Sequence, residues 1–376
     1  MLRKFNRGPE TVHLDLILSR YLTMKKQPHT QQPPFKTVPV QDACGMTIAH
    51  DMTEIIPDKS KGPAFKRGHR VQAGDICRLM RMGKNNLYVL DLDETQIHED
   101  EAVFELASAL AGPGVEFSAT PREGKLELYA SYPGLFRVNV EALTEFNMLD
   151  DVMCASIHTN TGVNKGDSLA ATRAIPLVID RENLDQATAL AKSAYPIFSV
   201  SVFNPLKIRL AIIGNEVYDG LIQDRFQAIV EEKTARLGAH VLEVNILPDD
   251  RKRITAQIRD YMDKETDLII TTGGMSVDPD DVTRESIEAV GFDEVHYSAA
   301  VLPGAMFLLG YTSETTIMGL PACGLYHRTT IFDLILPRVM AGDRPGKRDL
   351  ASLCHGGLCR NCPTCRFPDC AFGKSV

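Results

Sequence analysis

The 376-residue chain lacks several features that would place it in familiar classes of protein. No apolar run approaches the ~20 residues that a transmembrane helix needs, so a membrane protein is not expected. The net charge of −8 has the wrong sign for electrostatic binding of nucleic acid, because that affinity comes from cationic contacts to phosphates. The basic N-terminus has neither a continuous apolar segment nor a small-residue cleavage site, so no signal peptide is predicted and a cytoplasmic location is expected.

A uniform disulfide framework is also lacking. Four of the nine cysteines are scattered along the chain, whereas five fall within the last 23 residues. Without an export signal the thiols are expected to be reduced, and a terminal cluster of reduced thiols then indicates a metal site. The clustered residues are Cys354, Cys359, Cys362, Cys365 and Cys370.

The spacing of this cluster suits two kinds of metal centre. The order is C-x4-C-x2-C-x2-C-x4-C, and its middle run, Cys359, Cys362 and Cys365, matches the C-x2-C-x2-C core of bacterial ferredoxins. Cys370 departs from the ferredoxin pattern in its spacing and lacks a following proline. Tetrahedral zinc accepts four thiolates at such spacings. An iron–sulfur cluster and Zn²⁺ therefore both stay open, and a thiol-rich tail without metal is the alternative.

Length and changes in composition predict several domains. In the middle of the chain, the segments 125–131 and 135–143 have strand character. The predicted parts are an extension and proline-rich linker (1–34), an N-terminal domain (35–111), a β-rich middle domain (112–204), an α/β domain (205–343) and a cysteine-rich metal-binding tail (344–376).

From Lys207 onward, strand-like and helix-like segments alternate with short connections, and one of the expected helices covers residues 219–238. This alternation predicts an α/β fold with a parallel sheet and helices on both faces. Ligands of such sheets bind beyond the carboxyl ends of the strands. Three segments that follow expected strands should therefore converge on one crevice, namely 212–216, 271–281 and 319–324.

The segment TTGGMSVDPDD suits a phosphate group. Gly273 and Gly274 let backbone N–H groups approach an anion closely, because they adopt angles that a side chain forbids. A helix that begins near Asp281 adds the positive end of its dipole. Carboxylates repel a phosphate unless a cation lies between them, so Mg²⁺ is expected at Asp281, which alternatively serves only as the helix N-cap. The other residues expected to contact the ligand here are Thr271, Thr272, Ser276 and Asp278.

These residues resemble a known family. The segment 271–283 is similar to the loop of molybdopterin-binding domains in molybdenum cofactor biosynthesis, which include molybdopterin molybdenumtransferases of the gephyrin E type and related adenylyltransferases. Asp281 stands seven positions after Gly274, as the family aspartate does. Residues 63–89 resemble the molybdenumtransferase segment that precedes this domain. The matching motifs occur in order over residues 207–341, and they also include Glu216, Pro303, Gly304, Gly319 and Pro321.

The resemblance implies a protein that binds molybdopterin, adenylylated or not, and that acts in maturing the molybdenum or tungsten cofactor. As an enzyme it would insert molybdate or tungstate into adenylylated molybdopterin with release of AMP, and Asp281 and Glu216 would be its catalytic residues. The resemblance also implies a molybdoenzyme client and a homo-oligomer, for which a dimer is expected.

Several residues depart from the family pattern. The sequence has no Ser-Ala-Met-Asp-Gly motif, Ala305 and Met306 stand where a lysine is usual, and Gly324 replaces a proline of the Gly-Leu-Pro turn. These departures favour a non-catalytic carrier or redox sensor that uses the cysteine-rich tail, whereas Glu216 and Asp281 favour the enzyme. A metal-dependent phosphohydrolase acting on a nucleotide-like substrate is a third, more remote hypothesis.

The middle segment offers four further side chains of chemical interest. Cys154 and His158 could point into the crevice, although a core cysteine and a hydrogen-bonded histidine are the more ordinary roles. Lys165 and Arg173 could reach a phosphate or simply face solvent.

Overall fold

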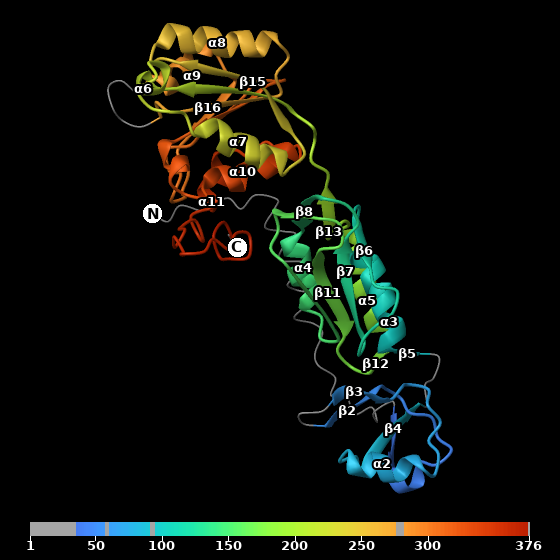
Figure 1. The fold of residues 1–376 in the computed structure, drawn as a ribbon. Coiled ribbons are helices and arrows are strands. Elements are labelled where there is room, and N and C mark those ends of the chain that lie inside the picture. Colours follow the sequence, from blue (N-terminus) through green and yellow to red (C-terminus); the bar gives the residue numbers. More distant parts are fainter. Residues whose placement is uncertain (1–34, 57–59, 91–94, 276–281, 375–376) are drawn as a thin grey trace, which may run out of the picture. The chain divides into compact units, whose positions relative to one another are not determined.

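The computed structural model describes residues 35–56, 60–90, 95–275 and 282–374. The chain divides into two compact units, residues 1–96 and 97–376, and Figure 1 shows the elements of each. No helix within these described ranges is long and apolar enough to cross a membrane.

The described part of the first unit is mainly β-structure around a small apolar core. The carboxylate of Asp75 lies 2.7 Å from Nε2 of His69 and accepts the backbone N–H of Gln72 at 2.9 Å. These two contacts hold the pKa of Asp75 below its usual range. Leu79 and Leu87 are fully buried. The elements are the antiparallel pair β1 (Phe35–Pro39) and β4 (Asn86–Leu90), the antiparallel pair β2 (Met52–Ile56) and β3 (Ser60–Phe65), η1 (Val40–Asp42) and α2 (Asp75–Arg81).

The second unit begins with two antiparallel sheets and the helices that pack on them. The four-stranded sheet has the order β6–β7–β11–β9, and the three-stranded sheet has the order β10–β8–β13. Their strands are β6 (Val115–Phe117), β7 (Lys125–Ala130), β8 (Gly134–Val138), β9 (Val152–Ser156), β10 (Thr161–Val163), β11 (Ser168–Ala174) and β13 (Phe198–Ser201). The other elements are β5 (Gln96–His98), α3 (Glu99–Leu110), α4 (Val140–Asn147), β12 (Val178–Asp180) and α5 (Arg181–Ser193).

Helix α3 packs with the elements that follow it in the chain. It contacts β7, β11 and α5, and its buried Leu106 shares one apolar cluster with Leu128 and Leu184. The domain boundary expected after residue 111 lies just after the end of α3. The core residues of α3 pack with residues that follow this boundary in the chain.

The remaining part of the second unit is built on a six-stranded sheet with the order β15–β14–β16–β19–β18–β17. The pairings among β15, β14, β16 and β19 are parallel, whereas β18 and β17 are antiparallel to their neighbours. The strands are β14 (Lys207–Ile213), β15 (His240–Leu247), β16 (Leu268–Thr272), β17 (Glu294–Tyr297), β18 (Leu308–Tyr311) and β19 (Thr316–Leu320).

The predicted α/β class is confirmed, but the sheet is mixed rather than wholly parallel. β18 and β19 are joined only by residues 312–315, and β17 and β18 only by residues 298–307. Neither connection contains a helix among the described residues, so neither can cross the sheet to return the chain in parallel. A short connection of this kind produces antiparallel neighbours.

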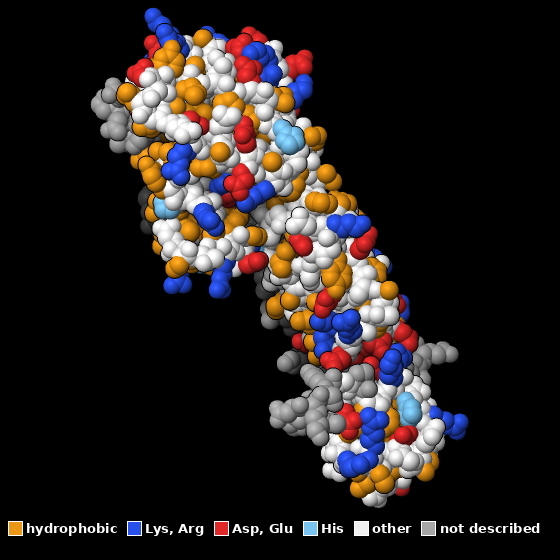
Figure 2. All heavy atoms as spheres, viewed as in Figure 1, with side chains coloured by type: hydrophobic (Ala, Val, Ile, Leu, Met, Phe, Trp, Pro, Cys, Tyr) orange, Lys and Arg blue, Asp and Glu red, His pale blue; other side chains and the backbone are white. Residues whose placement is uncertain are grey.

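Helices cover both faces of this sheet, as Figure 1 shows with α8 on one side and α7 and α10 on the other. Ile254 and Ile287 pack into the cluster on the first face, and Val230 and Ile335 pack into the cluster on the second. Figure 2 shows side chains of both charge signs intermixed on the visible face. The helices are α6 (Asn215–Tyr218), α7 (Phe226–Ala235), α8 (Arg251–Asp263), α9 (Thr283–Val290), η2 (Ala322–Leu325), α10 (Ile331–Met340) and α11 (Lys347–Ser352).

Two single-element predictions differ from the structure because a side chain caps a helix. The strand expected over 135–143 ends at Val138, since the side chain of Asn139 accepts the N–H of Ala142 at 3.2 Å and starts α4. The helix expected over 219–238 begins as α7 only at Phe226, since Asp224 accepts two backbone N–H groups at 2.9 Å.

The C-terminal tail packs against the α/β domain. Leu302 and Leu358 form a parallel bridge, in which the N–H of Leu302 donates to Gly357 and the N–H of Cys359 donates to Leu302, both at 2.8 Å. Phe372 is buried in the same apolar cluster as α10. The tail is therefore part of the packed second unit.

Candidate functional site

The carboxyl ends of three adjacent parallel strands meet at one edge of the sheet. Ile212 is in register with Thr272, and Thr272 is in register with Leu320. The turns after β14, β16 and β19 therefore begin side by side, at Gly214, Gly273 and Pro321. We refer to this place as the carboxyl edge.

Two glycines at the carboxyl edge leave no room for a side chain. Gly273 has φ +84°, and a Cβ there would overlap the carbonyl oxygen of Ile213. Gly274 has φ +58°, and a Cβ there would overlap Oγ1 of Thr283. The backbone of this turn thus runs directly against its neighbours, in a conformation that glycine adopts without strain.

Two buried threonine hydroxyls at this edge are not satisfied by the protein. Thr272 and Thr283 are both fully buried, and within the described part of the chain neither Oγ1 has a hydrogen-bond partner. Thr271, by contrast, donates its hydroxyl to the carbonyl of Met318 at 3.4 Å. Buried hydroxyls normally have partners, so Thr272 and Thr283 are suited to a ligand that supplies acceptors.

Thr283 is also the first residue of α9, whose N-cap position is Val282. The first N–H groups of a helix lack intrahelical partners and carry the positive end of the helix dipole. The place beside Thr283 therefore combines a hydroxyl, the first amide donors of α9 and a favourable potential for an anion. Thr272 is in register with Ile212 and Leu320, which belong to the apolar cluster on the other face of the sheet.

A reciprocal pair of hydrogen bonds links the turns after β14 and β15. The N–H of Asn215 donates to Oδ2 of Asp249 at 2.9 Å, and the N–H of Asp249 donates to Oδ1 of Asn215 at 3.1 Å. Asp249 was not among the residues expected in the site. Its position just after a predicted strand, in the segment ILPDD, was the available signal. Glu216 lies exposed in α6, one residue after Asn215.

The remaining glycine and proline residues of the family motifs support packing around this edge. A Cβ on Gly304 would overlap Ile331, whose N–H donates to the carbonyl of Pro303 at 3.3 Å. A Cβ on Gly319 would lie 2.8 Å from Cε of Met275. These glycines permit close contacts at the start of α10 and beneath the turn after β16.

Three predicted site residues, Ser276, Asp278 and Asp281, lie outside the described residues. Their assignment to the ligand and to Mg²⁺ stays a prediction. Wherever the structure describes the chain, no three His, Cys, Asp or Glu side chains gather as a possible metal site.

The five tail cysteines all lie within the described residues, and all are free thiols. They do not gather in threes as a possible metal site either. Sγ of Cys365 lies 3.2 Å from the hydroxyl of Thr329. This hydrogen bond, the backbone of Phe367 and the charge of Arg328 hold the pKa of Cys365 below its usual range. Cys359 packs against the apolar cluster around α10. The arrangement therefore does not fit a bound metal, and the iron–sulfur or zinc prediction is unsupported.

The four side chains considered in the middle segment do not gather at the carboxyl edge. Cys154 is buried in the core of the antiparallel sheets, where burial raises its pKa to about 12. Nδ1 of His158 contacts the carbonyl of Thr159 at 2.8 Å. Arg173 pairs with Glu99 at 3.2 Å. Lys165 is exposed.

Comparison with known proteins agrees with the motifs at the carboxyl edge. Residues 210–341 match the family described as a probable molybdopterin binding domain, and residues 37–91 match a family described as a domain of unknown function. The first match includes all three strand ends. The family resemblance inferred from the sequence is thus confirmed for this part of the chain.

Curated relatives match parts of the chain. A CinA-like protein of Thermosipho melanesiensis is 41% identical over 75 residues, which are 20% of this chain and 18% of the relative. A molybdopterin molybdenumtransferase of Haemophilus influenzae is 26% identical over 175 residues, which are 42% of this chain and 41% of the relative. The chain thus spans less than half the length of these relatives.

Among solved structures, the molybdopterin biosynthesis MoeA protein from Pyrococcus horikosii is 15% identical, and the match covers 92% of this chain and 80% of that chain at a TM-score of 0.31. The molybdopterin biosynthesis enzyme MoaB from Thermus thermophilus is 21% identical, and the match covers 37% of this chain and 98% of that chain at a TM-score of 0.32.

Proposed function

We propose that this chain, which carries a domain of the probable molybdopterin binding family, binds molybdopterin at the carboxyl edge of β14, β16 and β19. The observation that carries the proposal is the pair of buried hydroxyls on Thr272 and Thr283, which lack partners within the described ranges. A pterin ligand that carries a phosphate offers several acceptor oxygens, which such hydroxyls need.

The backbone at this edge supports a phosphate in the same place. Gly274 lies directly against Thr283, so the turn after β16 is held at the start of α9. The N-terminal end of α9 stabilises negative charge there. The pair formed by Asn215 and Asp249 keeps the adjacent turns in one arrangement.

The finer function that we propose is insertion of molybdate or tungstate into adenylylated molybdopterin, with AMP as the leaving product. Relatives named molybdopterin molybdenumtransferase support it, although the match covers about two fifths of their length. Glu216 and Asp281 stay the proposed catalytic carboxylates. The described side chains do not gather a magnesium site, so no step is assigned to Mg²⁺.

The alternative is a carrier that binds molybdopterin without transferring metal to it. The loop before β18 favours this alternative, because Ala305 and Met306 provide no cation where relatives with the full motif have a lysine. In this loop the carbonyl of Ala305 accepts the N–H of Ala299 at 3.0 Å, which is a structural contact. In both proposals the chain forms a homodimer and delivers the cofactor to a molybdoenzyme client.

Release of AMP from adenylylated molybdopterin distinguishes the two. The full chain, purified without oxygen, is incubated with the adenylylated pterin, Mg²⁺ and molybdate, and AMP is quantified. Molybdate-dependent release that Asp281→Asn and Glu216→Gln abolish supports the enzyme. Pterin binding without AMP release supports the carrier, and absence of both overturns the proposed function. Iron and zinc are quantified on the same preparation, and a content far below one metal per chain refutes the metal prediction for the tail.

A further inference from the structure

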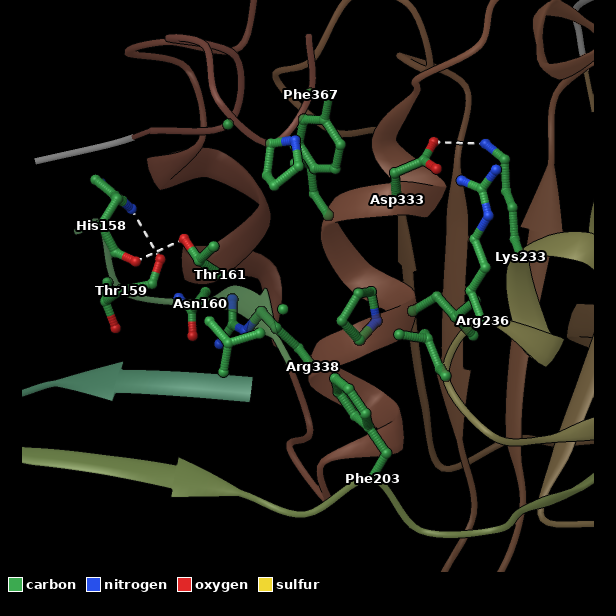
Figure 3. Close-up of a pocket in the computed structure, with 18 of the residues that line it drawn as sticks. His158, Thr159, Asn160, Thr161, Phe203, Lys233, Arg236, Asp333, Arg338 and Phe367 are labelled. Carbon is green, nitrogen blue, oxygen red and sulfur yellow. Dashed lines mark hydrogen bonds and ion pairs between the residues drawn. The ribbon is translucent and has the colours of Figure 1, made fainter. Parts of the chain in front are cut away.

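A cavity of about 770 Å³ lies in the second unit, and none of the carboxyl-edge residues lines it. Its volume falls within the ~300–1,000 Å³ typical of small-molecule sites. Figure 3 shows its labelled side chains converging from separate segments. These are Pro133, residues 158–164, residues 202–203, the end of α7 with residues 235–238, the helices α10 and α11, and the tail residues 367–368 and 372–374.

Two of the cations that line the cavity are neutralised by the protein. Lys233 pairs with Asp333 at 2.7 Å, as Figure 3 shows. Arg338 pairs with Asp343 at 3.1 Å and with Asp349 at 2.7 Å. Both cations are mostly buried, and each is compensated by a carboxylate. Because their charges are already balanced, Lys233 and Arg338 attract a further anion only weakly.

Lys374 differs from these cations. Its ammonium donates to Oγ1 of Thr161 at 3.1 Å, and among the described residues no carboxylate forms an ion pair with it. Burial lowers the pKa of Lys374, and the charges of Cys370 and Asp369 act in the opposite direction more weakly. A partly buried cation without a carboxylate partner is stabilised by any anion that reaches it.

The loop that holds Lys374 is itself fixed. The hydroxyl of Thr161 donates to the carbonyl of His158 at 2.6 Å, so its lone pairs face Lys374. The backbone N–H of Val138 donates to Oγ1 of Thr159 at 3.1 Å. The polar wall of the cavity is therefore preformed and needs no rearrangement to present the ammonium.

The rest of the lining is apolar and partly aromatic. Phe203 and Phe367 lie at opposite ends of the group of side chains drawn in Figure 3. Leu237, Leu334 and Pro337 also line the cavity. Such surfaces favour flat rings, because stacking adds to the gain from burying apolar area.

We propose that this cavity binds a small ring compound with one anionic group, a carboxylate, sulfonate or phosphate, that pairs with Lys374 while the ring lies against the apolar lining. The site is separate from the carboxyl edge, so it would hold a second ligand rather than molybdopterin. It stands whether or not the proposed function is correct.

The test compares two fluorescent probes that differ in one group. The probes are 8-anilino-1-naphthalenesulfonate and its uncharged relative N-phenyl-1-naphthylamine, titrated into the full chain. We expect one saturable site, with the sulfonate bound about tenfold more tightly than the uncharged probe. Lys374→Met should remove that difference, Lys374→Arg should retain it, and Lys192→Met, at an exposed lysine of α5, should leave it unchanged.

Three results would overturn the proposal. These are the absence of saturable sulfonate binding, equal affinity for the two probes, and an unchanged preference in Lys374→Met. Phe203→Leu provides a second variant if Lys374→Met does not fold, and it should weaken both probes. The variant Thr272→Val/Thr283→Val should bind the sulfonate as the parent does. Loss of binding in that variant would place the probe at the carboxyl edge and refute the cavity site.

Discussion

Asn215 and Asp249 hold each other through two reciprocal hydrogen bonds, of 2.9 and 3.1 Å, each from a backbone N–H to the other side chain. The two residues follow β14 and β15, which are adjacent parallel strands. The pair therefore fixes two turns of the carboxyl edge relative to each other.

Replacing Asn215 with alanine removes the amide oxygen that accepts from Asp249. We expect affinity for molybdopterin to fall about tenfold, because the turns lose their fixed arrangement. The free energy of unfolding should fall by only ~1 kcal/mol, since the pair is exposed. Isothermal titration and urea unfolding measure the two quantities. Gln227→Ala, at an exposed position of α7, is the control, and an unchanged affinity in Asn215→Ala would contradict the role of the pair.

The hydroxyl of Thr272 should be dispensable for stability. Because it is buried without a partner in the described structure, Thr272→Val should leave the free energy of unfolding unchanged or raise it. Thr271→Val is the matched comparison, since it removes a buried hydrogen bond to Met318 and should cost ~1 kcal/mol. Urea unfolding of both variants without ligand decides this, and a larger loss in Thr272→Val would mean that the protein itself satisfies that hydroxyl.

Gly273→Ala should destabilise the fold more than the same change at a glycine with open surroundings. The φ angle of +84° costs ~1 kcal/mol for alanine, and the overlap with the carbonyl of Ile213 adds ~1–3 kcal/mol. Gly238 has φ +80° with nothing within 4 Å, so Gly238→Ala should show the first cost alone. Equal losses in the two variants would show that the turn at Gly273 is not tightly packed.

The buried thiol of Cys154 makes stability depend on alkaline pH. Its pKa is raised to about 12 in the folded state, so between the ordinary thiol pKa and pH 12 the unfolded chain ionises while the native chain does not. The unfolded state then binds fewer protons, and the free energy of unfolding falls as pH rises through that range. Cys154→Ala should show a shallower fall in unfolding experiments at several pH values. Identical slopes would refute this coupling.

The parts of the fold that were predicted are those in which local pattern and topology agree. The buried strands around Ile212, Ile270 and Ile317 are continuous apolar runs, and glycine or proline follows each at the carboxyl edge. The antiparallel strands β17 and β18 were missed because their apolar runs are short and their pairing depends on the connections, not on the strand residues.

The site was predicted in part for a similar reason. Motif spacing marked Gly273 and Gly274, and Thr283 lies within the same segment. Asp249 becomes part of the site only because the turn after β15 meets the turn after β14. The cavity at Lys374 had no sequence signal, since its residues come from the middle domain, residues 202–203, three helices and the tail. The sequence shows five cysteines in one short segment, but it does not show their contacts. Cys359 packs against the apolar cluster around α10, whereas Cys365 forms a hydrogen bond with Thr329.

The central claim is that molybdopterin binds at the carboxyl edge, where Thr272 and Thr283 carry buried hydroxyls without partners among the described residues. Equilibrium binding of molybdopterin to the parent chain and to Thr272→Val/Thr283→Val, under anaerobic conditions, tests it most directly. We expect the double variant to remain folded and to bind at least about tenfold more weakly, because two hydroxyl donors to the ligand are lost. A folded double variant with the affinity of the parent would contradict the claim.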